Sequence, residues 1–159
     1  MVTPYCDGGE LFDQVKGAGK FEEEQAKRVF GEILQGVEYI HSMDVAHRDL
    51  SLENVLVNQG GNIVMDFGMA MRVPNDEETI PLGRCGKPNY MAPEIAMNRD
   101  TLIATFSDIW SLGIVLFIML SGIPPVEMAI PTDPRFAPLF FFIFRFLSHI
   151  FHFHSFILL

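Results

Sequence analysis

Three short polar segments in the middle of the chain constrain its fold more than any other feature. They are HRDLSLEN at residues 47–54, DFG at 66–68 and APE at 92–94. Charged side chains, an amide, glycine and proline gather in them, a composition typical of loops and turns. The rest of the chain must therefore supply a core that holds three polar loops.

A long amphipathic helix is predicted between Phe21 and Met43. Glutamates fill residues 22–24, in the first turn, where the helix dipole favours negative charge. Apolar residues recur along the segment at spacings of three and four, the period of one helix face. These positions are Ala26, Val29, Phe30, Ile33, Leu34, Val37 and Ile40.

Two short runs after this helix predict a small β-hairpin. Residues 55–57 and 63–65 are rich in β-branched side chains, and turn-forming asparagine and glycine residues lie between them. Residues 69–91 show no comparable pattern and are expected to form a long loop.

A second long helix is predicted over residues 108–120, which are apolar nearly all round. At this length such a helix suits the middle of a core better than a membrane span. A brief helix is expected around residues 11–15, and irregular structure over 124–134. The fold class predicted is mainly α with a small β-hairpin region.

Together and in this order, the three polar segments resemble the catalytic loop, the metal-binding loop and the end of the activation segment of protein kinases. Two further segments extend the likeness: TPYCDGGELFD at 3–13 is similar to a kinase hinge, and SDIWSLG at 107–113 to the start of the central helix of the C-terminal lobe. The resemblance covers residues 1–135. It implies a partial protein kinase domain, an incomplete C-terminal lobe whose N-terminal lobe is absent.

The N-terminal lobe would supply a GxGxxG loop and a lysine in a strand-like VAIK context, and neither is found in this sequence. The chain's lysines are Lys16, Lys20, Lys27 and Lys87. A triphosphate would then be held from one side only, and positioning is most of what a kinase contributes. We expect negligible activity from these residues alone.

The resemblance implies ATP and Mg²⁺ as cofactors. It places Asp49 at the position of the residue that orients the acceptor hydroxyl and accepts its proton. Asn54 and Asp66 match the two positions that ligate magnesium, which prefers hard oxygen donors. Taken singly, Asp66 beside Gly68 also fits a simple turn, and Asn54 the end of a loop.

The same resemblance implies a nucleotide site. Thr3 falls at the gatekeeper position, and the backbone from Pro4 to Cys6 would meet the adenine. Glu10 would face the ribose, and Leu56 would lie beneath the base.

Arg48 matches the arginine that pairs with a phosphorylated activation loop in many relatives. Thr79 is the only Ser or Thr between the DFG and APE segments, whereas Gly83 stands where many relatives carry their phosphorylated threonine. Asp108 matches an aspartate that accepts hydrogen bonds from the backbone of the catalytic loop.

Two positions depart from the family pattern. Ser51 stands where most serine/threonine kinases have lysine, and Lys87 stands where they have threonine. These positions face each other across the catalytic site, so a hydroxyl and an ammonium have exchanged places. We expect Lys87 to supply the missing positive charge. The alternative is an inactive relative in which both positions drifted independently.

The SLEN ending of the catalytic loop is nearer to serine/threonine kinases than to tyrosine kinases, and GGELFD resembles the calcium/calmodulin-dependent group. The function implied is transfer of the ATP γ-phosphate to hydroxyls of a protein substrate, the chain being inactive alone. The alternative is a non-catalytic binding module or decoy lobe.

Charge and cysteine content limit the kind of partner and the cellular location that we expect. A formal charge of -9 with scattered Lys and Arg argues against nucleic acid as a partner. Two cysteines are too few for a disulfide framework, and no secretory signal begins the chain, so a cytoplasmic location is expected. Nothing indicates an oligomeric state.

The last segment, residues 136–159, is rich in phenylalanine and matches no part of the kinase pattern. Residues 137–159 are long enough for a membrane anchor, but Arg145, three histidines and two serines would be costly in lipid. An unrelated or misjoined coding stretch is the preferred interpretation.

Overall fold

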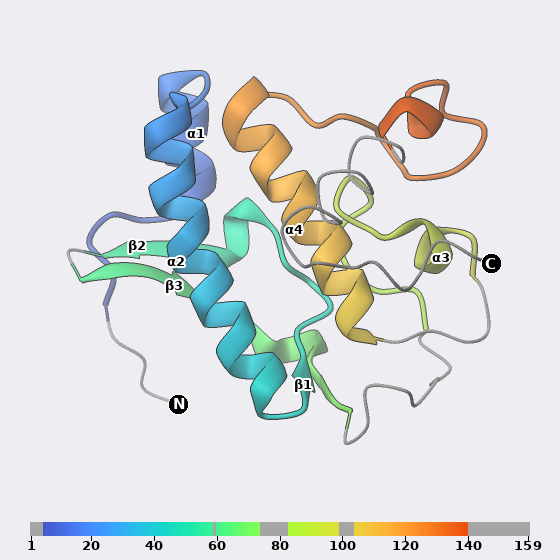
Figure 1. Ribbon diagram of the computed structural model, residues 1–159, viewed down its shortest axis with the longest axis horizontal. Coiled ribbons are helices and arrows are strands. Elements are labelled where there is room, and N and C mark those ends of the chain that lie inside the picture. The colour runs from blue at the N-terminus through green and yellow to red at the C-terminus, as the bar shows by residue number, and fades with distance from the viewer. Residues whose placement is uncertain (1–4, 59, 74–82, 99–103, 140–159) are drawn as a thin grey trace.

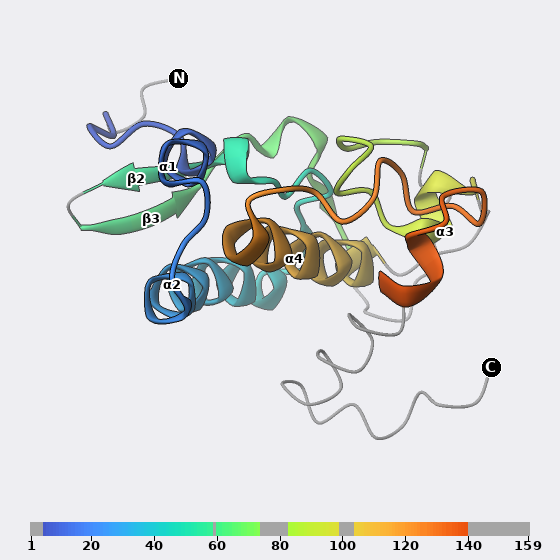
Figure 2. The same cartoon turned by 90° about the horizontal axis from the view of Figure 1, so that it is seen from above.

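Two long helices form the base of the fold in the computed structural model, which describes residues 5–58, 60–73, 83–98 and 104–139. These helices are α2 (Glu23–Ser42) and α4 (Ala104–Ser121), and they lie side by side (Figures 1 and 2). Figure 2 shows α1 (Leu11–Ala18), the strands and the polar loops on one side of this pair. The loops that carry the polar segments therefore rest on a helical base.

Helix α2 confirms the long amphipathic helix. Glu23 and Glu24 lie in its first turn, and its buried residues follow the predicted period. They are Ala26, Val29, Phe30, Ile33 and Val37. The brief predicted helix is also present, as α1, with Leu11 and Val15 buried.

Helix α4 confirms the second long helix, although it begins at Ala104, before the predicted start at residue 108. The polar first turn hid this start, because Ser107 satisfies its hydroxyl by donating to the Ala104 carbonyl, 2.7 Å away. Among the described residues, α4 alone is long and apolar enough to cross a membrane, yet 67% of that stretch is buried in the protein. This burial matches a core helix.

The predicted hairpin forms from β2 (Val55–Asn58) and β3 (Gly61–Val64), which pair antiparallel with Val55 opposite Val64. Residues 8–10 run beside β2: the Gly8 amide donates to the Val57 carbonyl at 3.0 Å, and the Val57 amide donates to the Gly9 carbonyl at 2.9 Å. The predicted hinge segment is therefore fixed to the hairpin.

The long loop predicted over residues 69–91 is wrong at its start. There β4 (Met71–Arg72) pairs antiparallel with β1 (Val45–Ala46), after a single 3-10 turn, η2 (Phe67–Met69). Two-residue strands are too short to show an alternating pattern, and their pairing depends on a distant partner. A second 3-10 turn, η1 (Leu52–Asn54), precedes β2, and the short helix α3 (Pro93–Ala96) follows the later loop.

The core continues past α4 and past residue 135. Val126 and Ala129, after α4, are fully buried, and Leu139 is 5% exposed. The ring of Phe136 lies 6.4 Å from that of Trp110 on α4, centroid to centroid. The segment 137–159, for which a membrane anchor was the alternative interpretation, lies mostly outside the described residues, which end at 139.

An ion-pair cluster closes the irregular segment between α4 and residue 136. Asp133 accepts from the Nε and Nη2 atoms of Arg135, each at 3.0 Å, and from the Glu127 amide at 3.0 Å. The hydrogen bonds from Arg135 hold the pKa of the Asp133 carboxyl well below its usual range. The folded chain therefore binds this proton less readily than the unfolded chain does.

Replacing Asp133 with asparagine is expected to lower the melting temperature at pH 7 by about 2–4 °C. A lowered folded-state pKa stabilises the protein above the unfolded pKa, near 4, and this contribution is lost as pH falls towards the folded value. In thermal melts, the difference in melting temperature between wild type and Asp133→Asn should become smaller below about pH 4. Glu38→Gln on the exposed face of α2 is the charge-matched control, and a gap that stayed constant down to pH 3 would contradict this account.

Candidate active site

The catalytic-loop segment is anchored by a buried carboxylate. Asp108 on α4 is fully buried; its Oδ2 accepts from the His47 amide at 2.8 Å, and its Oδ1 accepts from the Arg48 amide at 2.7 Å. These are the backbone contacts predicted for Asp108. Oδ2 also lies 2.8 Å from Nε2 of His41 on α2, so one carboxylate joins α2, α4 and the loop.

His47 joins the loop to the DFG segment. Its side chain is fully buried, and its Nε2 lies 2.9 Å from the Met65 carbonyl. The Met65 amide donates in turn to the Asn54 carbonyl at 2.9 Å. Residue 65 is thus tied to both ends of the catalytic-loop segment, and Asp66 follows it directly.

Asp49, Asn54, Ser51 and Lys87 form one polar cluster. Asn54 donates through Nδ2 to the Asp49 carbonyl at 2.7 Å and to Asp49 Oδ2 at 3.0 Å. Lys87 donates to Ser51 Oγ at 2.8 Å, and its Nζ lies 3.8 Å from Asp49 Oδ2. The ammonium is therefore next to both the carboxylate and the hydroxyl, as the exchange of residue types requires.

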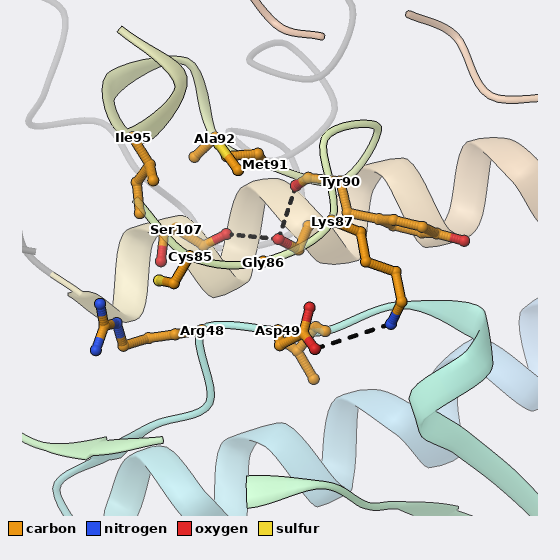
Figure 3. A pocket seen from close by; sticks show the side chains of 12 residues that line it. Arg48, Asp49, Cys85, Gly86, Lys87, Tyr90, Met91, Ala92, Ile95 and Ser107 are labelled. Atoms are coloured by element: carbon orange, nitrogen blue, oxygen red, sulfur yellow. Dashed lines mark hydrogen bonds and ion pairs between the residues drawn. The ribbon is translucent and has the colours of Figure 1, made fainter. Parts of the chain in front are cut away.

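Figure 3 shows how the two loops meet. The segment around Cys85, Gly86 and Tyr90 passes over the catalytic loop, and the Lys87 side chain reaches down to Asp49. A small recess lies between them, and the buried residues Ser107 and Ser111 of α4 are part of its lining. Asp49 and Lys87 belong to its lining.

Asp66 has a left-handed backbone, with φ 63° and ψ 73°, and its side chain accepts from the Gly68 amide at 3.1 Å. This conformation costs energy for a residue with a side chain, and such positions cluster at functional sites. The turn therefore holds a carboxylate in a defined orientation.

The donor set fits magnesium. The Asn54 amide nitrogen is directed at Asp49, so the Asn54 oxygen and the Asp66 carboxylate are the ligand atoms these two residues can offer. No group of three or more His, Cys, Asp or Glu within the described ranges could hold a metal by itself. Two protein oxygens are nevertheless sufficient, because Mg²⁺ usually takes its remaining ligands from water and substrate phosphates.

The nucleotide-site residues are only partly within the described chain. Glu10 pairs with Leu56 in an isolated antiparallel bridge, so the predicted ribose and adenine contacts are neighbours. Cys6 is partly buried and carries a free thiol. Thr3 and Pro4 lie outside the described residues.

Arg48 contacts two backbone carbonyls in the described chain, and its pairing with a phosphorylated activation loop stays a prediction. Its Nη1 donates to the Met69 carbonyl at 3.4 Å, and its Nη2 donates to the Gly83 carbonyl at 3.3 Å. Thr79, the candidate phosphorylation site, lies outside the described residues. Within the described chain, the guanidinium therefore bridges two backbone carbonyls.

Three features of the site differ from the sequence interpretation or were missed by it. Phe67 has its ring 5.0 Å from that of His47 but remains 48% exposed, which its sequence context did not indicate. Tyr90 was missed: it is buried, its hydroxyl accepts from the Leu52 amide at 3.5 Å, and burial raises its pKa. His41 was missed as well, because a histidine near a helix end gives no signal of a partner on another helix.

The fold and the arrangement of its loops define the protein kinase class. The chain belongs to the protein kinase family, because the model of the protein kinase domain matches residues 1–135. Among the curated proteins to which it is similar are some named as serine/threonine protein kinases.

Two of the similar curated proteins come from plants. The chain is 43% identical to CBL-interacting protein kinase 21 of Oryza sativa subsp. japonica over 129 residues, which are 80% of this chain and 24% of that protein. It is 40% identical to CBL-interacting serine/threonine-protein kinase 8 of Arabidopsis thaliana over 134 residues, 83% of this chain and 30% of that protein. The chain thus spans less than a third of the length of these relatives.

Proposed function

We propose that this chain is the C-terminal lobe of a serine/threonine protein kinase that transfers the γ-phosphate of ATP to hydroxyls of protein substrates. The observation that carries the proposal is the cluster of Asp49, Asn54, Ser51 and Lys87, in which a carboxylate and an ammonium lie 3.8 Å apart. The GGELFD segment further supports a member similar to the calcium/calmodulin-dependent group. The relatives' names, CBL-interacting kinases, support proteins as partners.

Asp49 acts on the acceptor hydroxyl. Its carboxylate orients the hydroxyl and takes up the proton as the oxygen attacks. The hydrogen bonds from Asn54 hold the loop and the carboxylate in one geometry, at 2.7 and 3.0 Å. This orientation is the larger part of the contribution, because phosphoryl transfer depends mainly on positioning and charge stabilisation.

Lys87 places a positive charge beside the transferred group. Its ammonium is held by the fully buried Ser51 hydroxyl, which restricts where the long side chain reaches. A preorganised cation at this point stabilises negative charge that develops in the transition state. Asn54 and Asp66 would hold Mg²⁺, which neutralises phosphate charge when bound.

The test is a chimera in which residues 1–135 replace the matched segment of CBL-interacting protein kinase 21. We expect magnesium-dependent phosphorylation of a protein substrate by the chimera and none by the 159-residue chain, which lacks the second set of phosphate contacts. Transfer of ³²P from ATP measures both. A folded chimera without transfer, or measurable transfer by the isolated chain, would contradict the proposal.

A non-catalytic binding module is the second candidate, favoured by the placement of the lysines. Lys27 pairs with Glu24 on an exposed face of α2, and Lys16 and Lys20 are also exposed. Among the described residues, Lys87 is therefore the lysine that reaches Asp49, and no second lysine lies beside it to hold the phosphates of ATP. The isolated chain would then bind proteins through its exposed loops while holding ATP weakly. Calorimetry with Mg-ATP separates the two candidates, since a module should give little heat.

A further inference from the structure

Lys87 reaches the site from a different loop than the one that carries Asp49. Its side chain contacts the catalytic loop at Ser51 and Asp49, but its backbone belongs to the segment at residues 83–92. The amides of Tyr90 and Met91 both donate to the Lys87 carbonyl at 3.0 Å, so a turn begins at the lysine. The position of the ammonium therefore depends on where this segment lies.

We propose that Gly86 and Arg48 are positioning residues that dock the 83–87 segment on the catalytic loop and thereby set the reach of Lys87 to Asp49. The proposal rests on the role given to Lys87 under the proposed function. It adds that the positive charge is conditional: the charge is in place only while this segment is docked.

Gly86 allows the segment to lie against the catalytic loop. Its φ of +88° is strained for any residue with a side chain. A Cβ at this position would lie 3.1 Å from the Arg48 carbonyl oxygen and 3.7 Å from Asp49 Oδ1. The first neighbour is backbone held by Asp108, so it cannot yield as a flexible side chain would. The close approach therefore requires glycine, one residue before Lys87.

Arg48 supports the same segment from its other end. Its Nη2 donates to the Gly83 carbonyl and its Nη1 to the Met69 carbonyl, at 3.3 and 3.4 Å. The planar guanidinium holds its N–H donors in a rigid fork, so its two Nη atoms serve both carbonyls at once. Within the described residues no hydrogen bond or ion pair joins the side chains of Arg48 and Lys87, so any influence of Arg48 on the lysine passes through the segment.

The position of the Lys87 ammonium is therefore coupled to the position of the 83–87 segment. A lysine at position 51 would not have this coupling. A cation carried by the catalytic loop would stay near Asp49 whatever the 83–87 segment does. Here, loss of either docking contact should release Lys87 to solvent while leaving Asp49 and Asn54 in contact, since their mutual hydrogen bonds do not involve the segment.

Reductive methylation of the 159-residue chain with ¹³C-formaldehyde tests this directly, because it has only four lysines. Lys87 is 36% exposed and hydrogen-bonded, whereas Lys27 is 72% exposed. We expect Lys87, assigned by Lys87→Arg, to react more slowly than the others. Gly86→Ala and Arg48→Met should each raise its rate about tenfold, the change that corresponds to loss of one charge-assisted hydrogen bond.

Gly31→Ala on α2 is the matched glycine control, since a Cβ there meets nothing within 4 Å, and its Lys87 rate should match wild type. A wild-type measurement covers the case in which a variant fails to fold: sub-denaturing urea should accelerate Lys87 methylation and Cys85 alkylation in parallel, with Cys6 changed to serine. Lys87 rates unchanged in both folded variants, or independent of Cys85, would overturn the proposal.

The outcomes also separate this proposal from the one on which it rests. Unchanged Lys87 labelling, together with an inactive Lys87→Ala chimera, removes the positioning role and leaves the proposed function. Labelling that responds as expected, together with a fully active Lys87→Ala chimera, keeps the docking contacts and removes the catalytic role of the lysine.

Discussion

Lys87→Ala in the kinase chimera is expected to lower kcat by about 10²–10³-fold while leaving the affinity for Mg-ATP nearly unchanged. The ammonium lies 3.8 Å from Asp49 Oδ2, and the proposed function brings the phosphoryl group and the acceptor hydroxyl together at this place. An interaction that matters chiefly in the transition state affects kcat, whereas the proposed adenine and ribose contacts lie elsewhere, at Cys6, Glu10 and Leu56. Steady-state phosphorylation rates and calorimetry measure the two effects.

The double variant Ser51→Lys/Lys87→Thr is the decisive companion. It moves the ammonium to the catalytic loop and returns a hydroxyl to position 87, so it should recover most of the activity that Lys87→Ala loses. Lys27→Ala removes an equal charge from an exposed surface, where the ion pair with Glu24 contributes little, and should leave kcat unchanged. Full activity of Lys87→Ala would show that the two positions drifted without a shared role.

Sequence reasoning predicted well the helices and strands that a local residue pattern determines. Helix α2 follows an uninterrupted three- and four-residue period, and the β2–β3 hairpin has β-branched strands around a turn-forming link. The β1–β4 pair was missed because two residues cannot show a period. The start of α4 was missed because its first turn is partly polar, and the Ser107 hydroxyl there is satisfied within the helix itself.

The site was predicted from motif spacing, and its contacts came from tertiary structure. The neighbouring positions of Lys87 and Ser51 could be inferred, because the family pattern places both residues at the catalytic site. The carbonyl partners of Arg48 could not be inferred, since the sequence does not show which backbone atoms a side chain contacts. The exposure of Phe67 was likewise invisible, because a phenylalanine beside an aspartate gives no indication of what covers it.

The second large effect concerns the buried carboxylate under the catalytic loop. Asp108→Ala is expected to lower the free energy of unfolding by about 3–5 kcal/mol, measured by urea denaturation. The change removes the acceptor for two backbone amides, that of His47 at a buried position and that of Arg48 at a partly buried one. Each donor left without a partner costs about 1–3 kcal/mol, and the His41 contact is lost in addition.

A graded series distinguishes this explanation from simple loss of volume. Asp108→Asn keeps the shape and one acceptor oxygen but turns an amide nitrogen towards one of the two donors, so its cost should be intermediate. His41→Ala removes only the partly exposed partner and should cost about 1 kcal/mol. Because the carboxylate fixes the loop that carries Asp49, the kcat of the corresponding chimeras should fall in the same order. Equal stability of Asp108→Ala and His41→Ala would mean that the backbone amides find other acceptors, and that the loop is held by its packing instead.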